Sequence, residues 1–170
     1  MSSNALLDLY VGDALGARRR VEEGFVPMSK SLLTRVQLLR FEVHELQTRT
    51  ALAAARVTKG SERDQYLRVA EQYGDKLGKE GMLWTDAIAT LRRAGIRSAL
   101  EDKDGAVREL LAAVTQCDAA DLGLHAAAAR VRLGELLGGD EGAALREVGL
   151  AALRSEDVKK PDAMVALFAP

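Results

Sequence analysis

The sequence contains little of what a β-structure requires. Only three prolines, one tryptophan, three tyrosines and three phenylalanines occur among its 170 residues. No proline lies between Pro27 and Pro161. Sandwiches and barrels of this size need frequent turns and many β-branched or aromatic residues. The composition therefore excludes those architectures and predicts an all-helical protein.

The sequence also lacks the marks of secreted, membrane and nucleic-acid-binding proteins. A single cysteine, Cys117, excludes an internal disulfide and fits a reducing compartment. No apolar run approaches the roughly 20 residues of a membrane helix, and residues 1–4 do not begin a signal peptide. The 24 basic and 25 acidic residues leave a net charge of −1, whereas nucleic-acid readers are usually strongly basic. We expect a cytoplasmic protein with neither a membrane nor a nucleic-acid partner.

Alanine and leucine are abundant, at 28 and 26 residues. Apolar residues recur at the helical spacing of three and four, and short breaks of Gly, Asp or Ser interrupt the pattern. Pro161 is suited to the first position of a helix. The pattern predicts helices over about 4–23, 29–57, 62–79, 83–100, 106–120, 124–137, 142–154 and 161–168. Gly24 and Pro27 are expected to end the first helix, and the next is expected to start after Ser29 or Ser31.

Short connections between these helices predict stacked antiparallel hairpins. The turns before Ala106 and Ala144 lie 38 residues apart, close to the roughly 34-residue period of the tetratricopeptide repeat. We predict one all-α domain over residues 1–170, a tetratricopeptide-like right-handed solenoid. Its expected parts are a 1–24 cap, hairpins over 29–79, 82–121 and 123–155, and a 161–168 cap helix.

Several stretches carry a resemblance to a known family. They are residues 83–95 (LWTDAIATLRRAG), 126–142 (AAAARVRLGELLGGDEG), 160–164 (KPDAM), 167–170 (LFAP), 32–40 and 51–55. Together they resemble the C-terminal helical repeat region of bacterial, chiefly myxobacterial, serine/threonine protein kinases. The similarity covers roughly residues 29–170, and residues 153–159 depart from the family's pattern.

The resemblance implies a tetratricopeptide-like extension that binds partners or regulates, while catalysis lies in a separate kinase domain. The sequence contains no Gly-rich loop, Val-Ala-Ile-Lys, His-Arg-Asp or Asp-Phe-Gly motif. We therefore expect a non-enzymatic protein–protein interaction or scaffold module that needs no cofactor. Ends of a short hairpin stack expose apolar surface unless capped, so self-association is the alternative if residues 1–24 and 161–168 do not suffice as caps. The alternative is a regulatory or partner-binding region of a bacterial serine/threonine kinase signalling protein.

Four residues are candidates for partner binding: Trp84, Arg92, Arg93 and Arg97. Trp84 is the single tryptophan and is expected to anchor the packing of two hairpins; an interface hot spot is the alternative. The three arginines lie on the first helix of a hairpin, which lines the groove in this repeat class. Arg93 and Arg97 share a helical face suited to an acidic peptide, with an ordinary solvated face as the alternative.

Other reactive side chains have simpler interpretations. Cys117 lies on an apolar helical stripe, which predicts a buried, inert thiol. His44 lacks metal-ligand partners three or four residues away and is expected to be exposed or capping. Asp118, Asp121 and His125 have ligand-like spacing, but Gly123 is expected to break the helix between them, so we expect no metal site.

Overall fold

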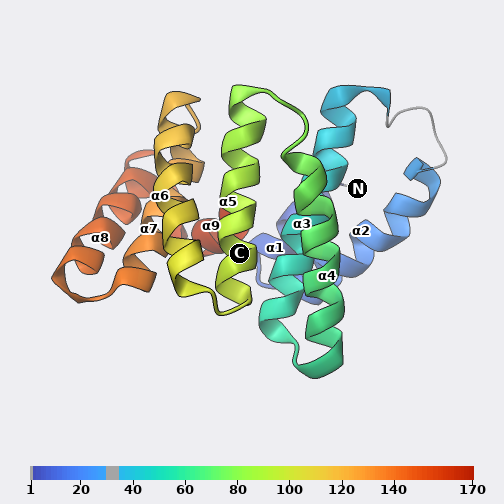
Figure 1. Cartoon of the computed structure of the whole chain (residues 1–170), viewed down its shortest axis with the longest axis horizontal. Helices are drawn as coiled ribbons and strands as arrows, with labels where there is room; N and C mark the ends of the chain where they lie inside the picture. The colour runs from blue at the N-terminus through green and yellow to red at the C-terminus, as the bar shows by residue number, and fades with distance from the viewer. Residues whose placement is uncertain (1, 30–34) are drawn as a thin grey trace.

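The computed structural model describes residues 2–29 and 35–170, and all regular structure in these ranges is helical. The all-α prediction is therefore confirmed for the described part of the chain. The helices, shown in Figure 1, are α1 (Ser2–Tyr10), α2 (Ala14–Ser29), α3 (Gln37–Val57), α4 (Gly60–Leu77), α5 (Leu83–Ala99), α6 (Lys103–Ala119), α7 (Gly123–Leu137), α8 (Gly139–Ser155) and α9 (Pro161–Phe168). None of these helices combines the length and apolar character needed to cross a membrane.

Three pairs of consecutive helices form the body of the protein. α3 packs on α4, α5 on α6 and α7 on α8, and these are the most extensive contacts between helices. Each pair is joined by a few residues at most: Thr58 and Lys59, residues 100–102, and Gly138 alone. α4 also contacts α5, and α6 contacts α7, so the pairs follow one another in a row (Figure 1).

The N-terminal region is not the single helix expected over residues 4–23. It forms α1 and α2, separated at Val11–Asp13, because Gly12 takes a positive φ of 90° that interrupts the helix. The Asp13 carboxylate then accepts a hydrogen bond from the Gly16 N–H at 2.8 Å. This bond caps the start of α2, so the break is built into the sequence.

The prediction that Gly24 and Pro27 end this helical region is wrong as well. α2 runs through Gly24 and Pro27 to Ser29. Because proline has no N–H, Pro27 removes one main-chain hydrogen bond from the last turn of α2. The following helix, α3, begins at Gln37, and the alternative start at Ser31 lies outside the described residues.

The small residues allow helices to approach until their backbones touch. Ala126–Ala129 of α7 are all buried. A Cβ added at Gly149 of α8 would lie 2.6 Å from the Ala127 oxygen and 2.7 Å from Val131 Cγ2. Such distances leave no room for a side chain. The contact between α7 and α8 therefore depends on glycine as well as on alanine.

Gly149→Ala tests this close approach. Alanine favours a helix over glycine by up to about 1 kcal/mol, but the steric conflict with α7 should outweigh that gain. We expect a net loss of about 1–3 kcal/mol in the free energy of unfolding, measured by urea denaturation. Gly123→Ala is the matched control, because a Cβ there meets no atom within 4 Å. Equal stability of the two variants would contradict the close packing of α7 and α8.

Candidate functional site

The first helices of the three pairs present a common surface, which α1 and α9 partly cover. α3 contacts α5, α9 packs against α7, and α1 contacts both α3 and α9. In Figure 1, α1 and α9 lie behind the row of paired helices, and the marked end of the chain lies over the lower part of α5. We call this surface the inner face. It contains Phe41, Glu45, Arg49 and Arg56 of α3, Trp84, Ile88, Arg92 and Gly95 of α5, and His125 and Arg132 of α7.

A buried ion cluster lies at the centre of the inner face. Glu45 accepts bonds from Arg92 at 2.6 and 3.1 Å, and from Arg49 on its own helix at 2.6 and 2.7 Å. The Arg92 side chain is 0% exposed, and those of Glu45 and Arg49 are buried as well. The cluster therefore fixes α3 against α5 through charged groups removed from water.

The electrostatics of the cluster keep Glu45 and Arg92 charged at neutral pH. Burial alone would raise the pKa of Glu45, but Arg49 and Arg92 outweigh it and hold this pKa below its usual value. Burial lowers the pKa of Arg92 to about 10, still well above neutrality. Two guanidinium groups thus face one carboxylate, and the cluster carries an excess positive charge that favours a further acceptor.

The C-terminal segment supplies that acceptor. Arg92 Nη1 donates to the main-chain oxygen of Phe168 at 2.6 Å. The Arg49 guanidinium lies 5.7 Å from the centroid of the Phe168 ring, within the range of a cation–π interaction. The ring of His125 lies on Phe168 as well, with centroids 4.4 Å apart. Phe168 is therefore held by both its main chain and its ring.

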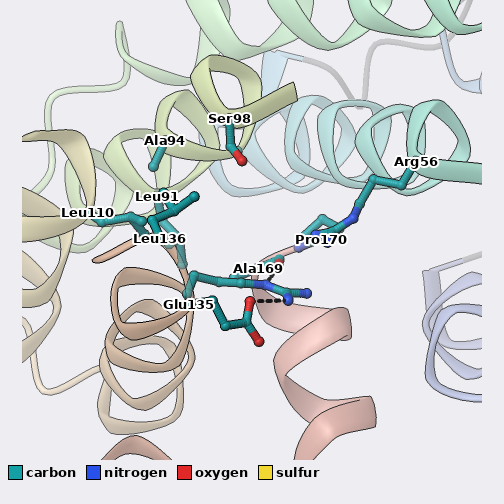
Figure 2. Close-up of a pocket in the computed structure, with 11 residues that line it drawn as sticks. Arg56, Leu91, Ala94, Ser98, Leu110, Glu135, Leu136, Ala169 and Pro170 are labelled. Atoms are coloured by element: carbon teal, nitrogen blue, oxygen red, sulfur yellow. Dashed lines mark hydrogen bonds and ion pairs between the residues drawn. The ribbon is translucent and has the colours of Figure 1, made fainter. Parts of the chain in front are cut away.

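The next residues continue along the inner face. Arg132 Nε donates to the Ala169 oxygen at 2.7 Å, and Arg132 also pairs with Glu135 at 2.8 Å. Ala169 and Pro170 are both buried. Figure 2 shows Ala169 and Pro170 among the residues of α5 and α7, with the side chain of Arg56 extended toward Pro170.

Open space remains at both ends of this segment. Beside the Phe168 ring lies a hollow of about 310 Å³, lined mainly by apolar side chains including Phe41, Trp84 and Ile88. Three hollows of about 120, 240 and 270 Å³ adjoin Pro170, and Arg56 lines all three. The inner face is therefore larger than the segment it holds.

The structure separates the four residues predicted for partner binding. Trp84 is half-buried and packs edge-on against Phe41 of α3, with ring centroids 4.6 Å apart, so it links two helix pairs. Arg92 lies apart from the other two arginines, on the inner face. Because it is enclosed by the ion cluster, it is not on the surface with Arg93 and Arg97.

Arg93 and Arg97 are partly exposed, but neighbouring acidic groups already bind them. Arg93 pairs with Glu109 at 3.2 Å, and Arg97 pairs with Asp102 at 3.3 Å. Both partners belong to the turn or helix that follows α5. The two arginines therefore do not converge on a common vacant site.

The remaining candidates behave as follows. Cys117 is buried, as predicted, and burial raises the pKa of its thiol to about 11. His44 is half-buried rather than exposed, and burial lowers its pKa. Asp118 pairs with Arg130, and no group of three potential metal ligands gathers within residues 2–29 and 35–170.

Sequence reasoning missed the residues that build the inner face: Glu45, Arg49, Arg56, Arg132 and Phe168. The sequence does carry a signal that Glu45 and Arg49 have partners. Glu45 and Arg49 are four residues apart at the start of a stretch that is buried on all sides up to Ala55. Charged residues in a fully buried helix require partners. The partner in α5 is 47 positions away and carries no local signal.

No protein-family model, curated protein or solved structure matches the chain. The resemblance to kinase-associated repeat regions therefore stays a prediction. Chemically, the inner face combines charged donors for main-chain oxygens with an apolar hollow for a side chain. Such an arrangement can hold a peptide segment.

Glu45→Gln tests the importance of the ion cluster. The neutral amide leaves Arg49 and Arg92 buried without a counter-charge, and we expect a loss of about 3–5 kcal/mol in the free energy of unfolding. Glu109→Gln, which removes the partner of the exposed Arg93, is the control and should cost less than about 1 kcal/mol. Similar costs in urea denaturation would show that the cluster contributes no more than a surface pair.

His125 predicts a specific dependence of stability on pH. Burial, reinforced by the charges of Arg92 and Arg49, lowers the pKa of His125 to about 3, whereas an unfolded histidine has a pKa of about 6.5. Between these values the unfolded state binds more protons, so stability falls as the pH falls. Over pH 6.5 to 5, His125→Gln should flatten this slope more than His44→Gln does. Unfolding free energies with an unchanged slope would contradict the burial of His125.

Proposed function

We propose that this chain is a non-enzymatic protein–protein interaction module of tetratricopeptide-like hairpins, and that its inner face binds a peptide segment of a partner. One observation carries the proposal: the inner face already holds a segment of the chain itself. Arg92 and Arg132 donate to the consecutive main-chain oxygens of Phe168 and Ala169 at 2.6 and 2.7 Å. Main-chain bonds of this kind suit any peptide of similar shape.

The arrangement of the helices supports the repeat-like part of the proposal. Three hairpins follow in a row, and their first helices α3, α5 and α7 supply the inner face. Stacked hairpins bury a continuous core and leave one side of the stack for binding. α1 and α9 cover part of that side.

The chemistry of the inner face favours binding over catalysis. Its histidine, His125, has a pKa of about 3 and is a poor base at neutral pH. The thiol of Cys117 is buried with a pKa of about 11, which disfavours the thiolate needed by a nucleophile. The arginines are engaged as hydrogen-bond donors to a carboxylate and to main-chain oxygens.

The proposal is tested by selecting peptides from a random displayed library against the full chain carrying Phe168→Ala. This variant removes the ring that occupies the inner face. We expect selected peptides to lose about tenfold in affinity when Arg132→Ala is added, because a charge-assisted hydrogen bond is lost. Arg130→Ala, on the same helix but paired with Asp118, should leave affinity unchanged.

Two results would contradict the proposal. One is that no peptide binds the Phe168→Ala chain while circular dichroism shows it folded. The other is that Arg132→Ala and Arg130→Ala change affinity equally, since the peptides would then bind away from the inner face.

A further inference from the structure

We propose that the partner segment carries an aromatic residue, then a small residue, and an acidic residue two positions after the small one, and that residues 168–170 of the chain compete for the same place. This inference rests on the proposed function and adds the chemistry of the partner. Each position follows from a different part of the inner face.

The aromatic position is defined by the surroundings of Phe168. The centroid of its ring lies 4.4 Å from that of His125 and 5.7 Å from the Arg49 guanidinium. An aliphatic side chain would keep neither the stacking nor the cation–π contact. The hollow of about 310 Å³ beside it, lined also by Trp84 and Ile88, leaves room for a ring larger than that of phenylalanine.

The small position is that of Ala169, where the segment passes closely along α5. Ala169 is 6% exposed and packs in the core cluster that contains Leu91 and Ala94. A Cβ added at Gly95 would lie 3.3 Å from the Pro170 oxygen. The main chain of the segment therefore lies close against α5, and the enclosed Ala169 leaves space only for a small side chain at that position.

The acidic position lies just beyond Pro170. Arg56 lines each of the three hollows that include Pro170, with volumes of about 120, 240 and 270 Å³. Arg132 shares two of these hollows and Arg63 shares the third. The acidic groups there are Glu135, already paired with Arg132, and Glu101 in the largest of the three.

Arg56 itself has no ion pair within the described part of the chain. Arg56 as a whole is exposed. The packing around its guanidinium, and then the positive charge of Arg132, lower its pKa. A carboxylate placed beyond Pro170 would relieve this repulsion and gain a charge-assisted bond. Residues 168–170 do not supply such a side chain, so a partner that does would have an advantage over them.

That advantage matters because the internal segment has a large effective concentration. A tethered ligand commonly competes at millimolar effective concentration. A partner segment with only the same three residues would therefore bind weakly. The acidic residue and a larger aromatic ring are the features that would displace the internal segment.

The test measures fluorescence anisotropy with a labelled peptide that has the sequence of residues 161–170 followed by one aspartate. One matched peptide ends in lysine instead, and another has alanine in place of phenylalanine. We expect the full chain carrying Phe168→Ala to bind the aspartate peptide about tenfold more tightly than either matched peptide. The chain with Phe168 intact should bind it about tenfold more weakly than the variant, because its own segment competes.

Arg56→Gln and Arg19→Gln separate the acidic position from general charge. Arg56→Gln, added to Phe168→Ala, should remove the difference between the aspartate and lysine peptides. Arg19→Gln removes the same charge from an exposed position on α2 and should preserve that difference. Equal binding of the aspartate and lysine peptides, or an unaltered difference after Arg56→Gln, would overturn the inference.

A second measurement applies if Phe168→Ala does not fold. The unlabelled peptides are titrated into the unaltered chain, and emission of Trp84 is followed, since this single tryptophan lines the same hollow as Phe168. A change in emission with the aspartate peptide at about tenfold lower concentration than with the lysine peptide supports the inference, and equal or absent changes overturn it. If library peptides depend on Arg132 but lack the predicted pattern, the inference fails while the proposed function stands.

Discussion

The inner face depends on one buried carboxylate. Glu45 binds the guanidinium groups of Arg49 and Arg92, and the latter side chain is entirely removed from water. Burying ions costs several kcal/mol each unless geometry and further hydrogen bonds compensate. Here one carboxylate cannot satisfy every donor of two arginines, and the Phe168 oxygen accepts one of the remainder. The C-terminal segment thus helps to compensate the burial of the charged groups that α3 and α5 bring together.

This coupling has a consequence for binding. Any ligand that replaces residues 168–170 must offer an oxygen to Arg92 in the same place, because a buried guanidinium N–H without an acceptor is costly. A peptide main chain does so whatever its sequence. Discrimination among peptides must then come from the side-chain positions, namely the ring beside His125 and the space beyond Pro170. Main-chain affinity and side-chain specificity are supplied by different parts of one surface.

Much of the fold could be predicted from the sequence, because helices depend on local patterns. The apolar periodicity located α5 to α9 to within a few residues, and the buried Cys117 followed from its stripe. The break at Gly12 was missed although glycine followed by aspartate is a local signal for ending one helix and capping the next. The apolar periodicity over residues 4–23 favours one continuous helix, and it conceals the shorter signal of Gly12 and Asp13.

The site could not be predicted in the same way, because it is made by pairs far apart in the chain. Arg92 lies beside Arg93 in the sequence, and adjacent helical residues point in different directions. Burial of the first and exposure of the second depend on Glu45, which approaches only after α3 packs on α5. A composition rich in alanine and leucine fixes helices and lets them pack closely. The few charged residues that this packing encloses then determine what the surface can bind.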